Sequence, residues 1–286
     1  MLSIRFEPVK EKPRIALYGC FQVGKSTLIN CLMKRYVALT GNGLATTSLT
    51  ARYRYGDKKL QYRRADGCLA DITTEQLRNL SSLSDMYPDK SFFSLEAKEP
   101  AEILNLCDIV DTPGFDANSA DTDAALGILN SINYGLFVIP NRGLWEVERK
   151  LLKRLTEHVS VSVIMNCSAG RGMPKWIPSH SKNEKILAEN TAAISSEGIQ
   201  TLPLGGEQIF VCNALFHWSQ QADFNASKAY IEGADDLSKQ IKATLEMKDE
   251  NTSAENIIAL SRIPQLVDAL KARIAKYDSG THKWGD

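Results

Sequence analysis

The stretch that decides the fold is "GCFQVGKST", residues 19–27, which stands between the apolar segments "RIALY" (residues 14–18) and "LINCLM" (residues 28–33). This order predicts a buried strand, a glycine-containing loop and a helix that continues to Tyr36. Gly19, Gly24, Lys25 and Ser26 satisfy the pattern G-x-x-x-x-G-K-[ST], in which backbone N–H groups surround an anion. The positive end of the helix dipole is directed at the same anion. The sequence therefore predicts a phosphate-binding loop.

Each residue type in this loop has an expected role. Lys25 is expected to reach the β- and γ-phosphates, and the Ser26 hydroxyl is expected to ligate Mg²⁺. The predicted phosphate contacts come from Gly19, Gln22, Val23, Gly24, Lys25, Ser26 and Thr27. GTPases, ATPases and kinases all use such a loop, so the loop alone does not select the nucleotide.

A second motif, "CDIVDTPGF" (residues 107–115), narrows the choice. A carboxylate at the end of a strand, here Asp111, can hold Mg²⁺ through water, and the Gly114 N–H can meet the γ-phosphate. A small-molecule kinase would not need this motif. Between the two motifs, Thr46 or Thr47 is expected to close over the γ-phosphate and complete the magnesium shell.

The rest of the chain alternates short apolar strands with helical patterns. This alternation predicts an α/β fold of three layers, with a mostly parallel sheet and helices on both faces. We expect one domain over residues 1–286, with insertions near 65–90 and 170–200 and a closing helix over about 263–277.

Composition limits the partners and the compartment. The 34 basic and 34 acidic side chains give a net charge of zero, so no nucleic-acid partner is expected. Six cysteines without metal-ligand spacing predict reduced thiols and a cytoplasmic protein. The amino terminus shows no apolar signal core, and no window is long and apolar enough to span a bilayer. Any membrane contact is therefore expected to be peripheral or to be supplied by another chain.

The motifs together resemble the bacterial dynamin-like GTPases, within the translation-factor-like P-loop GTPases. The resemblance rests on "GCFQVGKSTLIN", "ATTSLTARYRYG" and "DTPGF" and runs from about residue 13 to 277. It implies a P-loop GTPase-type fold that hydrolyses GTP to GDP and phosphate with Mg²⁺. It assigns Thr47 as the switch threonine, with Thr46 as the alternative, and gives catalytic roles to Lys25 and Gln22. It also implies stimulation by a G-domain homodimer or a related GTPase, and work in membrane remodelling or vesicle release.

The sequence departs from this family where the base is read. The family usually has N/T-K-x-D, but "VIMNCSAGRG" supplies Asn166 without the lysine or the aspartate. The loss of a bidentate carboxylate predicts weaker preference for guanine over adenine, and a later "FVCNAL" offers backbone near Asn213. Phe115 stands where some small GTPases carry a water-orienting glutamine, so we expect slow intrinsic hydrolysis. A nucleotide-binding scaffold with weak or no hydrolysis, and a ribosome-associated GTPase, are the alternatives.

Two weaker patterns favour structural interpretations. The basic and aromatic stretch "ARYRYGDKKLQYRR" (residues 51–64) is expected to form one hairpin, whose charges are solvated rather than bound to lipid or nucleic acid. Leu144, Val147, Leu151 and Leu155 have helical spacing and are expected to pack in the core.

Overall fold

A nine-stranded sheet forms the centre of the computed structural model, with the strand order β4-β3-β5-β2-β6-β1-β7-β8-β9. The structure describes residues 12–38, 50–64, 67–73, 76, 92–115, 126–167, 177–224, 239, 241–243, 245–246, 251–278 and 283–284. The strands of this sheet are β1 (Arg14–Tyr18), β2 (Thr50–Tyr55), β3 (Lys59–Arg64), β4 (Leu69–Asp71), β5 (Phe92–Glu99), β6 (Asp108–Asp111), β7 (Tyr134–Pro140), β8 (Ser160–Asn166) and β9 (Ile209–Cys212).

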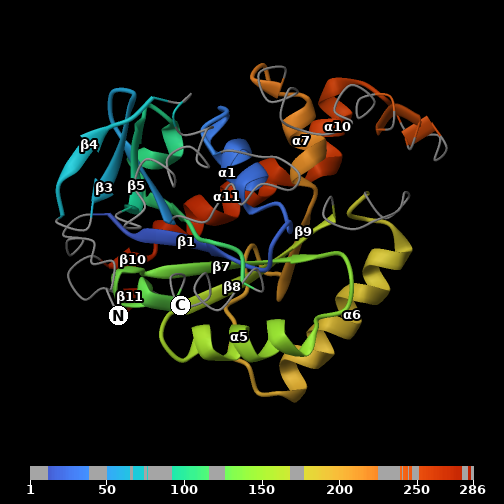
Figure 1. The fold of residues 1–286 in the computed structure, drawn as a ribbon. Coiled ribbons are helices and arrows are strands. Elements are labelled where there is room, and N and C mark those ends of the chain that lie inside the picture. Colours follow the sequence, from blue (N-terminus) through green and yellow to red (C-terminus); the bar gives the residue numbers. More distant parts are fainter. Residues whose placement is uncertain are drawn as a thin grey trace.

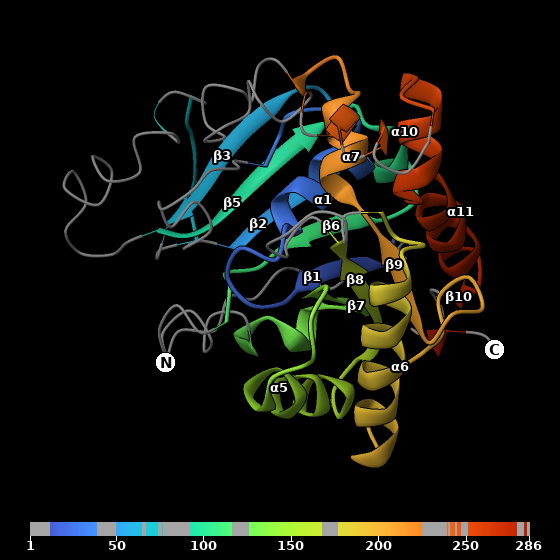
Figure 2. The same cartoon turned by 90° about the vertical axis from the view of Figure 1, so that its right-hand side faces the viewer.

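Helices cover both faces of this sheet, as Figure 1 and Figure 2 show. The α-helices are α1 (Lys25–Met33), α5 (Glu146–Thr156), α6 (Ser181–Ser196), α7 (Ala214–Ser219), α10 (Ala254–Ser261) and α11 (Ile263–Ile274). Two short 3₁₀ helices, η1 (Glu102–Asn105) and η2 (Leu129–Ser131), and a small pair of strands, β10 (Tyr277–Asp278) and β11 (Lys283–Trp284), also lie in the described part of the chain. The predicted three-layer α/β fold is confirmed. Within the described residues, no helix is both long and apolar enough to cross a bilayer.

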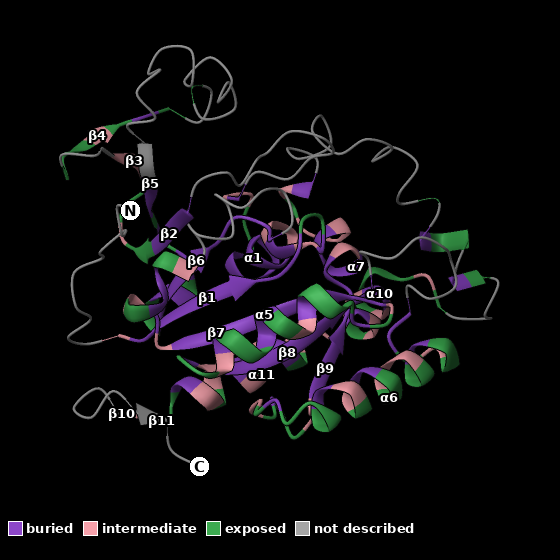
Figure 3. Cartoon of the chain, turned by 60° about the horizontal axis from the view of Figure 1, so that its bottom comes forward, coloured by how far each residue is buried: buried purple, intermediate pink, exposed green. Residues whose placement is uncertain are grey.

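The central strands run parallel and are buried on both faces. β6, β1, β7, β8 and β9 pair in parallel in that order. Along β1, Ile15 and Leu17 enter one hydrophobic core, whereas Ala16 and Tyr18 enter the other. This alternation explains why "RIALY" is apolar almost throughout, as expected of a strand between two helical layers. Figure 3 shows burial concentrated in these strands, while α5 and α6 carry exposed residues on their outer sides.

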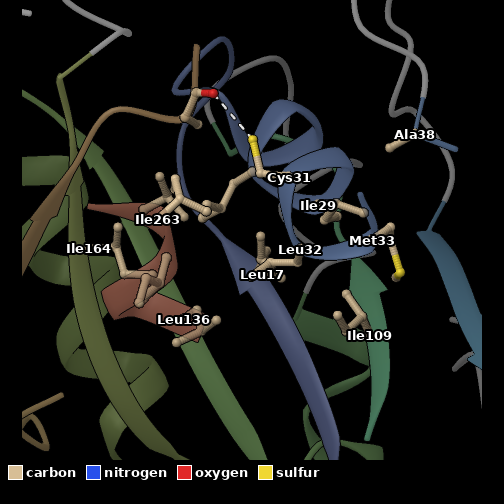
Figure 4. Close-up of a cluster of buried hydrophobic side chains, with 14 of the residues drawn as sticks. Leu17, Ile29, Cys31, Leu32, Met33, Ala38, Ile109, Leu136, Ile164 and Ile263 are labelled. Atoms are coloured by element: carbon tan, nitrogen blue, oxygen red, sulfur yellow. Dashed lines mark hydrogen bonds between the residues drawn. The ribbon is translucent and has the colours of Figure 1, made fainter. Parts of the chain in front are cut away.

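The two cores belong to different helical layers. The first joins the sheet to α1, α7, α10 and α11, and Figure 4 shows Ile29 and Leu32 of α1 beside Leu17 of β1. The second joins the sheet to α5 and α6. The phosphate-loop helix α1 is therefore anchored by apolar packing along its length, which fixes the position of its first turn.

The expected hairpin of residues 51–64 is wrong in its pairing. β2 and β3 both form, but β5 lies between them, parallel to β2 and antiparallel to β3. Residues 94–97 of β5 are buried, whereas β3 is only partly covered. The strand with the more apolar alternation thus takes the inner position, and the strand rich in charge lies near the edge, where water reaches it.

Two smaller expectations also need correction. The helix predicted to include Tyr36 ends at Met33, because Lys34 adopts a left-handed φ of 54° and the buried Asn30 side chain accepts hydrogen bonds from the N–H groups of Val37 and Ala38.

Val147 is 48% exposed and not in the core. At that turn of α5 the buried position belongs to Glu148, whose carboxylate binds Arg142 and the backbone N–H of Trp145.

Candidate nucleotide-binding site

The loop between β1 and α1 has a left-handed backbone at Gly24 and Gln22, a conformation that few residue types adopt easily. Gly24 has a φ of +87°, and a Cβ there would lie 2.3 Å from Asn166 Nδ2. Gln22 also adopts a left-handed φ, of 60°, although it carries a side chain, and it is exposed at the loop tip. Val23 is buried, and Thr27 is partly buried. A non-glycine residue held in this region marks a loop whose surroundings determine its conformation.

Lys25 is held beneath this loop. Its side chain is buried, and Nζ donates hydrogen bonds to the carbonyl oxygens of Gly19 and Cys20, both at 3.0 Å. Gly19 thus contributes its carbonyl to placing the ammonium group. A buried cation at the first turn of a helix supplies a strong positive field for an anion bound in the loop.

Ser26 and Asp111 form the corner of the site that fits a metal ion. Ser26 Oγ donates to Asp111 Oδ2 at 3.0 Å. Within the described part of the chain, the other carboxylate oxygen, Oδ1, is buried and has no hydrogen-bond partner. Burial raises the pKa of Asp111 to about 6, although the nearby Lys25 ammonium and the Ser26 hydroxyl act in the opposite direction. A carboxylate and a hydroxyl are the hard oxygen ligands that Mg²⁺ prefers, so these residues fit that ion.

The segment after Asp111 packs directly on the phosphate loop. The Thr112 hydroxyl donates to the Leu17 carbonyl at 2.7 Å. Gly114 allows a close approach, because a Cβ there would lie 2.8 Å from Phe21 Cα. Phe115 donates its backbone N–H to the Gly19 carbonyl at 3.3 Å.

The Phe115 side chain does not face the site. It is 1% exposed, and its ring stacks on that of Tyr18 with centroids 6.0 Å apart. A buried aromatic ring cannot orient an attacking water molecule, so this position contributes packing and not chemistry.

Asn166, at the end of β8, connects the phosphate loop to the start of α7. Its Nδ2 donates to the Val23 carbonyl at 2.9 Å, and its Oδ1 accepts from the Ala214 N–H at 3.1 Å. The sequence predicts a nucleotide contact for Asn166, but it gives no signal of these two buried bonds. The Cys167 side chain is fully buried in the core shared with α5 and α6, so it does not replace the lysine of the usual motif.

Asn213 lies next to this connection, and its side chain has a structural partner. Oδ1 accepts from the Phe216 N–H at 3.0 Å and caps α7. Any contact of this turn with a base would therefore come from its backbone, as expected from the sequence. Thr46 and Thr47 lie outside the described residues, and their roles stay predictions.

The basic residues of 51–64 are largely paired within the chain. Arg52 is buried, and its Nη2 lies 2.6 Å from Asp108 Oδ2. Arg63 pairs with Glu96 at 3.4 Å, and Lys59 pairs with Asp71 at 3.4 Å. These pairs favour a structural role for the cations over a lipid or nucleic-acid surface.

The strand, loop and helix, with Lys25 under the loop and the Ser26–Asp111 corner beside it, define a P-loop nucleotide-binding protein. The family described as 50S ribosome-binding GTPase matches residues 14–167, which is more than half of the chain. The chain belongs to this family and so carries a GTPase domain. No curated protein matches it.

Solved structures that match this chain at low sequence identity include two with a TM-score of 0.50, which share its fold. A structure of an oligomerised bacterial dynamin pair has 17% identity and a TM-score of 0.50, and the match covers 90% of this chain and 36% of that chain. A second structure of such a pair has 18% identity and a TM-score of 0.50, with 82% and 37% covered. Era from Aquifex aeolicus, a variant bound to GDP and AlF₄⁻, has 17% identity and a TM-score of 0.39, with 82% and 57% covered. The chain thus spans little more than a third of the bacterial dynamin chains that it matches.

Proposed function

We propose that this chain binds GTP with Mg²⁺ and hydrolyses it to GDP and phosphate, as the GTPase domain of a dynamin-like protein. The observation that carries the proposal is the corner formed by Ser26 and Asp111, where a buried carboxylate beside the phosphate loop keeps one oxygen without a partner among the described residues. The sequence resemblance supports the dynamin-like assignment, and the bacterial dynamin pair supports the fold alone.

In this proposal, each residue of the site acts on a different part of the bound nucleotide or on its metal ion. Lys25 neutralises charge on the β- and γ-phosphates from beneath the loop, and the Gly114 N–H contacts the γ-phosphate. Gln22, exposed at the loop tip, faces charge that develops during transfer, and Thr47 or Thr46 closes over the γ-phosphate. Ser26 and Asp111 would hold Mg²⁺, which would supply positive charge to neutralise the phosphates.

The site has no general base among these residues. Phosphoryl transfer depends mainly on positioning and electrostatic stabilisation, and the Phe115 ring is buried away from the loop. We therefore expect slow turnover by the isolated chain and stimulation by a second G domain. Membrane remodelling or vesicle release, through peripheral contact at the cytoplasmic face, is the role we propose for the whole protein.

The first experiment is calorimetric titration of the chain with GTP and then with ATP, with Mg²⁺ present. Tight binding of GTP alone supports a guanine-selective GTPase that does not need the usual aspartate. Equal binding of both supports a site with weak base selectivity, and no binding of either moves the scaffold alternative ahead.

Lys25→Ala tests the site itself. We expect GTP affinity to fall at least about tenfold, because a charged contact to phosphate is lost. Lys150→Ala is the matched control, since Lys150 lies on the outer face of α5 with 74% of its side chain exposed and pairs with Glu146. Unchanged affinity in Lys25→Ala would contradict the proposed site.

A ribosome-associated GTPase is the second candidate, and the description of the matched family favours it. Sedimentation with 50S subunits and flotation with anionic liposomes, each with GTP and with GDP, separate the two. Nucleotide-dependent sedimentation with 50S subunits, without flotation, would overturn the membrane role.

A further inference from the structure

The sheet order places the two ends of a bound nucleotide on opposite sides of β1. β6, with Asp111 at its carboxyl end, lies on one side of β1, and β7, β8 and β9 follow in order on the other. If the terminal phosphate and metal lie at the Ser26–Asp111 corner, the nucleoside must extend over the carboxyl ends of the other strands. At about 4.8 Å per strand, β9 lies roughly 14 Å from β1.

Ala214 stands at this far end, and its two backbone polar groups are held by Asn166, beside the phosphate loop, and by Cys31, in the last turn of α1. Its N–H donates to Asn166 Oδ1 at 3.1 Å. Its carbonyl accepts from the Cys31 thiol of α1 at 3.2 Å, the dashed contact in Figure 4. Ala214 and Cys31 are both buried, at 0% and 1% exposure. The turn after β9 is therefore tied to the phosphate loop through Asn166 and to its helix through Cys31.

We propose that Cys31 is a positioning residue for the nucleoside end of the bound nucleotide: its hydrogen bond to Ala214 fixes the turn between β9 and α7 that lies beside the base. The inference rests on the proposed function. It predicts that Cys31 contributes to the affinity for the nucleoside and does not change the affinity for the phosphates.

The chemistry of the thiol suits this role. Burial raises the pKa of Cys31 well above its usual range, so the sulfur keeps its proton at neutral pH and can donate it. Thiols are weak hydrogen-bond donors. However, α1 packs against α7 and Ala214 is buried, so water has little access to the Ala214 carbonyl and cannot easily replace the thiol as donor. The loss of one buried hydrogen bond changes an equilibrium by roughly three- to tenfold.

The test compares GTP with inorganic tripolyphosphate, which offers the phosphates without a nucleoside. Both are titrated calorimetrically into the full chain with Mg²⁺, for the wild type, Cys31→Ala and Cys31→Ser. We expect Cys31→Ala to bind GTP about three- to tenfold more weakly and tripolyphosphate within about twofold of the wild type. Cys31→Ser keeps a donor, so its GTP affinity should lie between those of the wild type and the alanine variant.

Cys107→Ala is the matched control. Cys107 is also 1% exposed and donates to a carbonyl, that of Ile103 at 3.7 Å, but it lies at the amino end of β6, away from the site. We expect this variant to bind both ligands as the wild type does. If Cys31→Ala does not fold, Cys31→Val fills the position without a donor and should lose the same factor for GTP.

The outcomes separate this inference from the proposed function. If the wild type binds neither GTP nor tripolyphosphate, the proposed function fails. If the wild type binds both, and Cys31→Ala loses affinity equally for both or for neither, the positioning role is overturned and Cys31 only supports packing. A serine variant weaker for GTP than the alanine variant would also overturn it.

Discussion

Asn166→Ala offers a quantitative test of how the phosphate loop is held. The wild-type amide donates to the Val23 carbonyl and accepts from the Ala214 N–H. All three residues are buried, at 0% exposure for Asn166 and Ala214 and 3% for Val23. Alanine would leave one buried acceptor and one buried donor without partners. Each such group costs about 1–3 kcal/mol, so we expect the free energy of unfolding to fall by about 2–6 kcal/mol.

The same change should weaken nucleotide binding. The Val23 carbonyl belongs to the loop that surrounds the phosphates, and Asn166 holds it from β8. Without this bond, the loop must be ordered by the ligand itself, and the cost appears as lost affinity. We expect GTP affinity to drop at least about tenfold, which corresponds to roughly 1.4 kcal/mol. Urea unfolding measures the stability, and calorimetric titration of the folded variant measures the affinity.

Asn190→Ala is the matched control for this prediction. Asn190 is 1% exposed and makes the same two kinds of bond, accepting from the Leu144 N–H at 2.8 Å and donating to the Arg142 carbonyl at 2.9 Å. It lies on α6, away from the phosphate loop. We expect a similar loss of stability and no change in GTP affinity. The reasoning is refuted if Asn166→Ala binds GTP as the wild type does, or if both variants lose affinity equally.

Two further predictions concern the loop tip and the metal corner. Gln22→Gly relieves a left-handed backbone at φ 60° and should change stability by no more than about 1 kcal/mol in either direction, while GTP turnover falls roughly tenfold or more. Thermal unfolding and phosphate release measure the two, and an unchanged turnover would remove Gln22 from the chemistry. Burial raises the pKa of Asp111 from 3.8 to about 6, so the folded chain binds the carboxyl proton more tightly than the unfolded chain does. Without Mg²⁺, the contribution of Asp111 to stability therefore declines as pH rises from about 4 to about 6. Asp111→Asn should abolish that decline, so the variant should be more stable than the wild type at pH 7. Urea unfolding measures the free energy of unfolding of both proteins at pH 4 and at pH 7. If the difference between them is the same at the two pH values, the reasoning is wrong.

The phosphate loop could be predicted from the sequence because its chemistry is local. Strand, glycine turn, lysine and helix follow one another within residues 14–33, and each step has a residue pattern of its own. The meeting of Ser26 with Asp111 was also predictable, since parallel strands bring their carboxyl ends to one edge of the sheet.

What the sequence could not show depends on contacts between distant segments. Turn residues between β2 and β3 indicate a hairpin, and no local signal shows that β5 separates the two strands. The two bonds of Asn166 depend on the positions of Val23 and Ala214, which come from other elements. The burial of Phe115 against Tyr18 likewise needs the second core to be in place.

The position of β5 has a consequence for how the chain acquires its structure. β2 and β3 are synthesised before β5 and are joined by only residues 56–58. However, β5, the strand that separates them in the sheet, begins at Phe92. Pairing that bridges such a sequence distance is slow, because a loop must close before the contacts form. We expect the amides of β5 to gain protection late in pulse-labelled hydrogen exchange during refolding, and protection in step with β1 would contradict this. β2 pairs with β5 along one edge and holds Ala51 opposite Asp111 along the other, so until β5 enters the sheet the strand beside the Ser26–Asp111 corner has an unpaired edge.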